Sequence, residues 1–120
     1  MPTERPHAVV TGASSGIGRA VAERLLADGW RVTGVQRGEA GLSHPAFESR
    51  RTDLADLDAV DRLAGDLAAP DAFVHAAGMM RVGALGTLRA DDARLMWQVH
   101  VGAAMRLADA WLPRMAAAGH

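Results

Sequence analysis

One glycine-rich turn constrains this chain more than any other feature. Gly12, Gly16 and Gly18 lie between a short apolar run and a helix-like pattern. Glycines at such a turn allow a sharp reversal, let backbone approach a phosphate without a Cβ clash, and let the helix pack on the strand. The helix N-terminus offers unpaired N–H groups, and Ser14 and Ser15 add hydroxyl donors. The stretch predicts a dinucleotide-binding turn; the alternative is a tight strand-to-helix turn that binds nothing.

The spacing of these glycines is G-x-x-x-G-x-G, with Thr11 directly before the turn and Ile17 inside it. In this respect the stretch resembles the short-chain dehydrogenase/reductase family. The resemblance implies an oxidoreductase that transfers hydride between a nicotinamide cofactor and a carbonyl/alcohol pair. It also implies that the whole turn, Ile17 included, contacts the cofactor.

The remaining pattern predicts an α/β fold, a three-layer Rossmann-like parallel sheet. Apolar runs without polar alternation are typical of parallel strands buried on both faces, and the predicted strands cover 7–10, 30–35, 46–52 and 72–75. Little room is left for a helix between the second and third strands, and the third is expected at the sheet edge. We predict one NAD(P)-binding domain, residues 1–120, ending after the fourth strand and a long helix.

Helices are predicted over 15–27, 54–67 and from 88 to about 117. Ile17, Val21 and Leu25 recur at intervals of four, which favours a buried face on the first helix. Thr87 is a plausible N-cap for the last helix, and Pro113 is expected to kink or close it.

Composition excludes several classes of function. The 120 residues carry a net charge of −1 and no cysteine, so disulfides, thiolate metal sites and a broad nucleic-acid surface are not expected. The histidines show no ligand spacing, and no metal is predicted. No apolar run approaches membrane-spanning length and no signal core is visible, which favours a cytoplasmic protein without a membrane partner.

The residues at the end of the second predicted strand indicate which nicotinamide cofactor is preferred. In a βαβ unit this point faces the adenosine ribose, where a carboxylate favours NAD; here the sequence has Gln36 followed by Arg37. A guanidinium matches a 2′-phosphate through bidentate bonds, so NADP(H) is favoured over NAD(H). The alternative is a solvated loop arginine. Ser15 weakens the preference, because many NADP-preferring relatives carry a basic residue there.

Two further stretches match the family's cofactor site. Asp53 and Leu54 stand where the resemblance implies contact with the adenine, although Asp53 equally suits the N-cap of the following helix. His75-Ala76-Ala77-Gly78 is similar to the family's Asn-Asn-Ala-Gly segment, with both asparagines replaced. The resemblance implies that these small residues admit the cofactor ribose and that His75 bonds across strands. Met79 borders either a substrate pocket or a packed loop.

His100 stands where many relatives carry an asparagine that helps to place a water in a proton relay. A helix-face histidine bonded to backbone is the simpler account.

The catalytic residues that the resemblance implies are a serine and a Tyr-x-x-x-Lys pair. This sequence contains no tyrosine, and its basic residues are all arginine. We therefore expect the cofactor-binding part of such an enzyme, inactive alone. The alternatives are a non-catalytic dinucleotide-binding or interaction module and one half of a split enzyme. An uncovered fourth strand would be an exposed apolar edge, so we expect a homo-oligomer or a complementing C-terminal half.

Overall fold

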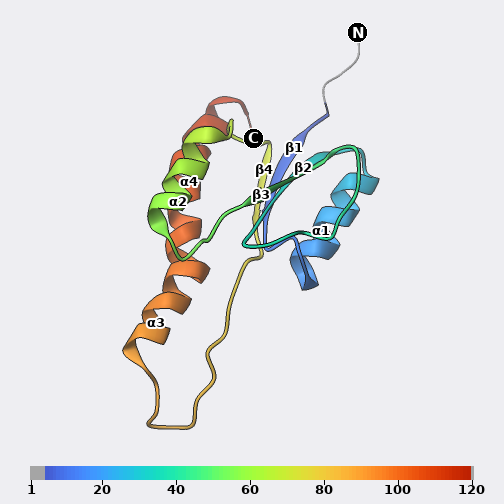
Figure 1. The fold of residues 1–120 in the computed structure, drawn as a ribbon. Helices are drawn as coiled ribbons and strands as arrows, with labels where there is room; N and C mark the ends of the chain where they lie inside the picture. Colours follow the sequence, from blue (N-terminus) through green and yellow to red (C-terminus); the bar gives the residue numbers. More distant parts are fainter. Residues whose placement is uncertain (1–4, 120) are drawn as a thin grey trace.

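The computed structural model describes residues 5–119, which form one parallel sheet flanked by helices (Figure 1). The strand order is β3-β2-β1-β4, and every pairing is parallel. The strands are β1 (His7–Thr11), β2 (Arg31–Gln36), β3 (Phe47–Arg51) and β4 (Ala72–His75). The helical elements are α1 (Gly16–Ala27), α2 (Leu57–Asp66), α3 (Ala90–Trp97), the π-helical segment η1 (Gln98–Gly102) and α4 (Ala103–Ala117).

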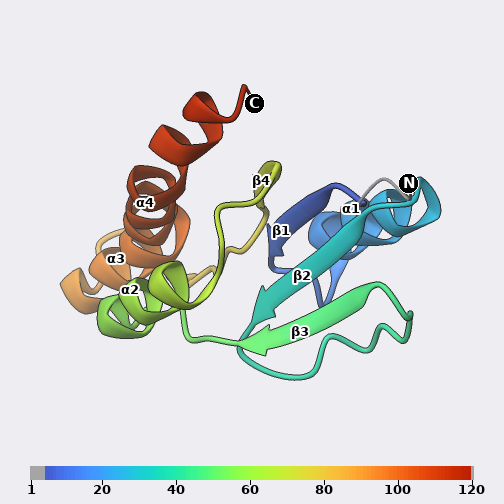
Figure 2. The ribbon, with the colours of Figure 1, turned by 90° about the horizontal axis from the view of Figure 1, so that it is seen from above.

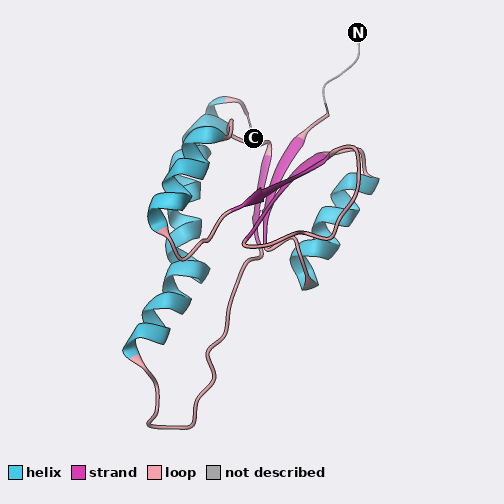
Figure 3. Cartoon of the chain, viewed as in Figure 1, coloured by secondary structure: helices cyan, strands magenta, loops and turns pink. Residues whose placement is uncertain are grey.

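The helices make three layers with the sheet, as the sequence predicted. Helix α1 lies on one face, and α2 and α4 lie side by side on the other (Figure 2). No helix separates β2 from β3 in the described chain (Figure 3), and β3 is an edge strand (Figure 2). The α/β, Rossmann-like prediction is confirmed.

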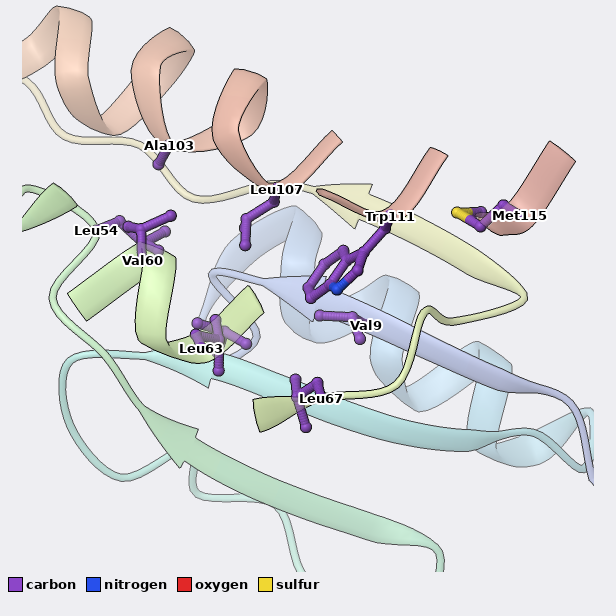
Figure 4. Packing of buried hydrophobic residues seen from close by; sticks show 10 residues of the cluster. Val9, Leu54, Val60, Leu63, Leu67, Ala103, Leu107, Trp111 and Met115 are labelled. Carbon is purple, nitrogen blue, oxygen red and sulfur yellow. The ribbon is translucent and has the colours of Figure 1, made fainter. Parts of the chain in front are cut away.

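The larger core fills the space between the sheet and the α2–α4 pair. Val9 from β1, Leu63 from α2 and Leu107 and Trp111 from α4 all point into it (Figure 4). The ring of Trp111 meets Phe73 of β4 edge-on, with ring centroids 5.3 Å apart. Helix α4 therefore covers one face of β4, whose residues are all half-buried.

The face that α1 buries is the predicted one except at Ile17, since Val21 and Leu25 are partly buried against the core on this side of the sheet. Ile17 is 79% exposed, whereas Gly18, Ala22 and Leu26 face the sheet. A Cβ on Gly18 would lie 2.0 Å from the carbonyl oxygen of Gly12. The small residues bring the helix so close to the strand that they, and not the larger Ile17, define its buried side.

Two helix starts also differ from prediction. Helix α2 begins at Leu57 and not at 54, because the Asp56 carboxylate accepts from the N–H groups of Asp58 and Ala59. Helix α3 begins at Ala90, after a non-helical Arg89. Thr87 is not its cap, because the Thr87 hydroxyl donates to the carbonyl of Ala84 at 2.6 Å and closes a turn in the loop instead.

The predicted long helix follows one continuous path, but its hydrogen-bonding pattern changes part-way along it. The π-helical segment η1 separates α3 from α4. Pro113 lies inside α4, which continues to Ala117, so the proline does not close the helix. None of the helices described between residues 5 and 119 is long and apolar enough to span a bilayer.

Two leucines of α4 test the packing of the larger core. Leu107 is fully buried and Leu112 is 51% exposed. Leu107→Ala should lower the free energy of unfolding by about 2–5 kcal/mol, since it removes buried methyl groups and leaves a cavity. Leu112→Ala should change it by about 0.5 kcal/mol or less. Urea denaturation followed by tryptophan fluorescence measures both; equal effects would contradict the placement of α4.

Candidate functional site

A cleft of about 350 Å³ opens at the carboxyl ends of β1, β2 and β4. It lies where parallel α/β sheets bind their ligands, beside the turn that leaves the central strand. Its walls come from five segments: the β1–α1 turn, the end of β2, the residues after β3, the chain after β4, and η1. The lining residues are Gly12, Ser14, Ser15, Val35, Gln36, Arg37, Thr52, Asp53, Leu54, Ala76, Ala77, Gly78, Met79, Arg81 and Val99.

The glycine turn packs directly on the chain that leaves β4. Gly12 has φ +71°, and a Cβ there would lie 2.7 Å from the Ala77 backbone. Any larger residue would separate the two segments as well as strain the turn. The floor of the cleft is thus made of two backbone segments in contact, Thr11–Gly12 and Ala76–Ala77.

The N-terminus of α1 is left without a side-chain cap. Ser15 occupies the N-cap position and makes no capping hydrogen bond, and no acidic residue stands in the first turn. Gly16, at φ +58°, would carry a Cβ into open space. Unpaired N–H groups and the positive end of the helix dipole suit an anion at this place.

The hydroxyl of Thr11 links three groups at the end of β1. It accepts from the N–H groups of Ala76 and Ala77, each at 3.1 Å, and lies 2.8 Å from Nδ1 of His75. With both acceptor positions used, the hydroxyl donates its proton to Nδ1. His75 then carries its own proton on Nε2, which lies 2.9 Å from the carbonyl of Val99.

This network fixes His75 as a neutral imidazole. Burial lowers the pKa of His75 below its ordinary value of 6.5, and the nearby His100 acts in the same direction. Hydrogen bonds to backbone at Val99 and His100 oppose that shift. A proton added at Nδ1 would face a hydroxyl that already accepts two bonds, so the network holds only while His75 is neutral.

His100 projects from η1 toward the loop after β4. Its Nε2 lies 2.8 Å from the carbonyl oxygen and 3.1 Å from the backbone nitrogen of Met79. A Cβ on Gly78 would lie 2.7 Å from the His100 ring. The ring thus ties this loop to the helix, in agreement with the backbone-bonded role considered from the sequence.

At the β2 end of the cleft, Arg37 is exposed and makes no hydrogen bond or ion pair to any described residue. Gln36 beside it donates from Nε2 to the Ser49 hydroxyl at 2.5 Å, and its Oε1 is buried without a partner in the described chain. Asp53 accepts from the N–H of Ala55 at 3.0 Å and does not cap α2. The capping alternative for Asp53 is therefore wrong.

The family model for short chain dehydrogenases matches residues 6–120. The chain belongs to the short-chain dehydrogenase family. It is 36% identical over 102 residues to 2,3-dihydro-2,3-dihydroxybenzoate dehydrogenase of Escherichia coli, covering 82% of this chain and 41% of that one.

Solved structures of the family agree with the sequence match. A short-chain dehydrogenase from Streptomyces avermitilis superposes with TM-score 0.88 at 34% identity, over 99% of this chain and 47% of that one. L-sorbose reductase from Gluconobacter frateurii, complexed with NADPH and L-sorbose, gives TM-score 0.83 at 28% identity, over 96% and 49%. The chain therefore spans about half the length of these short-chain dehydrogenases.

The structure gathers most of the site residues predicted from the sequence into the cleft wall. Nine of them line it: Gly12, Ser14, Ser15, Arg37, Asp53, Leu54, Ala76, Ala77 and Gly78. The others do not line it: Gly16, Ile17, Gly18, His75 and His100. Gly18 and His75 support the wall from behind, whereas Ile17 points into solvent.

Four lining residues were missed: Val35, Thr52, Arg81 and Val99. Val35 and Thr52 follow from strand ends once the strand order is known. Arg81 could have been found from the sequence, because it is a charged residue within an apolar loop.

The Thr11 hydroxyl should be needed for stability. Thr11→Val keeps the shape of the side chain but leaves the N–H of Ala77 and Nδ1 of His75 without their partner, whereas the N–H of Ala76 keeps the Thr11 carbonyl at 3.2 Å. We expect the free energy of unfolding to fall by about 1–3 kcal/mol. Thr11→Ser retains the hydroxyl and should lose clearly less. Urea denaturation compares the two, and equal losses would show that the hydroxyl bonds contribute nothing.

The neutral state of His75 predicts a pH dependence. Its pKa is lower in the folded than in the unfolded chain, so the unfolded state binds the proton first as pH falls. Stability is fully present above about pH 6.5 and decreases as pH falls through the folded pKa. His7, whose pKa burial also lowers, contributes in the same direction.

His75→Asn should flatten this dependence, and adding His7→Asn should flatten it further. Denaturation midpoints between pH 5 and pH 8 measure the effect. A His75→Asn curve parallel to wild type would contradict the neutral state assigned to His75.

Proposed function

We propose that this chain binds NADP(H) in the cleft and forms the cofactor-binding part of an oxidoreductase acting on a carbonyl/alcohol pair. The observation that carries the proposal is the uncapped N-terminus of α1, which meets a glycine turn at the cleft floor. A pyrophosphate is the dianionic group that such a terminus suits. Family membership supports dinucleotide binding in general.

The lining residues match the successive parts of a dinucleotide. Ser14, Ser15 and the first N–H groups of α1 would hold the pyrophosphate. Asp53 and the buried Leu54 would contact the adenine, and the small residues Ala76, Ala77 and Gly78 would admit the ribose on the nicotinamide side. The partnerless Oε1 of Gln36 is an acceptor of the kind that a ribose hydroxyl satisfies.

Arg37 supports NADP(H) over NAD(H). It lines the cleft where the ribose of the adenosine would lie, and no carboxylate among the described residues neutralises it. A free guanidinium binds a 2′-phosphate through paired hydrogen bonds. L-sorbose reductase from Gluconobacter frateurii, a related protein whose structure is complexed with NADPH, gives independent support by relationship.

When bound, the nicotinamide supplies or accepts the hydride; the residues of this chain bind and orient it. The sequence contains no tyrosine or lysine, so the 120 residues do not contain the Tyr-x-x-x-Lys pair that the resemblance implies. We therefore expect the isolated chain to bind cofactor without turning it over.

In this proposal, a second copy of the chain or a complementing C-terminal half would complete the enzyme. Within the described sheet β4 pairs on one side only, and Trp97, Met105 and Leu112 are exposed on the α3–α4 side. Both features suit a protein partner. A cytoplasmic location remains part of the proposal.

Titration of the purified chain with NADPH and NADH, followed by nicotinamide fluorescence, tests the proposal. We expect saturable binding with NADPH preferred. Arg37→Met should weaken NADPH binding by about tenfold or more, since charge-assisted bonds are lost, and leave NADH binding nearly unchanged. Arg62→Met, an exposed arginine of α2 outside the cleft, is the matched control. Absence of binding by either nucleotide would contradict the proposal.

A further inference from the structure

The cleft is lined by two guanidinium groups that come from opposite sides of β1. Arg37 follows β2, and Arg81 lies in the loop after β4. Because β2 and β4 flank β1 in the sheet, the two cations stand at opposite ends, with the glycine turn between them. The proposed 2′-phosphate site accounts for Arg37 only.

The backbone of Arg81 makes a hydrogen bond to α3, whereas its side chain makes one long ion pair. Its N–H donates to Sδ of Met96 on α3 at 3.4 Å. Its Nε lies 3.8 Å from Oδ1 of Asp92, well beyond the usual 2.7–2.9 Å of a charge-assisted hydrogen bond. No other ion pair of Arg81 occurs in the described chain, and the side chain is 47% exposed. The terminal nitrogen pair of the guanidinium is left without an internal acceptor.

In the proposed arrangement, no negatively charged group of the cofactor lies at the Arg81 end of the cleft. The two phosphates of the pyrophosphate lie at the α1 terminus in the proposed arrangement, and the 2′-phosphate lies at Arg37. The nicotinamide end is a neutral amide on a ring that is positively charged when oxidised. A guanidinium beside that end, whose Nε faces Asp92 while its terminal nitrogens have no partner in the described chain, fits an anion carried by the other reactant.

The loop that carries Arg81 is rich in apolar side chains. Met79 lines the cleft with it, and Met80, Val82 and Leu85 of the same loop are exposed. The loop runs out from β4 and returns at α3, as Figure 1 shows. A guanidinium group in an apolar loop suits a molecule with one carboxylate and an apolar body.

We propose that Arg81 binds the carboxylate of the substrate, and that the substrate is a small hydroxy or oxo acid with an apolar body. The inference rests on the proposed function, because it places this acid next to the bound nicotinamide. A planar carboxylate would receive two parallel N–H bonds from the terminal nitrogens, while Asp92 holds Nε from behind.

Benzoate is a suitable probe, with benzamide as its neutral counterpart of the same shape. The isotopically labelled chain is first saturated with NADPH, which occupies the other anion sites, and each probe is then titrated by two-dimensional NMR. We expect benzoate to bind and benzamide to bind far more weakly. Arg81→Met should weaken benzoate binding by about tenfold or more, and Arg81→Lys should weaken it less.

Arg89→Met provides the control, because Arg89 is an exposed arginine of the same loop that does not line the cleft. It should bind benzoate as wild type does. Equal binding of benzoate to wild type and Arg81→Met, or of benzoate and benzamide to wild type, overturns the inference while NADPH binding stands. Failure to bind NADPH overturns the proposed function and this inference together.

Discussion

The turn after β1 packs directly against the chain after β4, and this contact positions the strands and helices around the cleft. Gly12 leaves no room for a Cβ against Ala77, and the Thr11 hydroxyl holds the N–H groups of Ala76 and Ala77. These bonds fix where β4 ends, and His75 carries them on to the backbone of Val99 in η1. Strand, turn and helix are thus locked at one place, and the cleft is the space above it.

The parts of the fold that depend on local sequence were predictable, and those that depend on competition between similar signals were not. The glycine turn and the strands follow from short runs of residues, because each needs only its own neighbours. The start of α2 does not: Asp53 and Asp56 are equally good caps by residue type, and Asp56 wins because its carboxylate reaches two N–H groups. The prediction that Ile17 is buried is wrong because Gly18 lets the helix lie close against the turn, with its small residues facing the sheet.

The π-helical segment explains how the two histidines reach their partners. Nothing in the sequence of η1 announces an extra residue in the turn, yet π-helical segments occur frequently at functional sites. Here the segment presents the carbonyl of Val99 to His75 and the ring of His100 to Met79. Both histidines stand where the family resemblance implies asparagine, so an imidazole ring replaces an amide in the links from η1 to β4 and to the loop after it.

The arginines that line the cleft and the titratable His75 behind its wall have different tasks. Arg37 and Arg81 carry guanidinium groups, whose charge does not change in the physiological range. His75 does titrate, but it lies behind the wall and holds backbone rather than ligand. Lowering the pH therefore changes the shape of the cleft before it changes the positive charge on these two arginines, because protonation acts on the bond between His75 and Thr11. Affinity for an anion and geometry of the floor are controlled by separate residues in this chain.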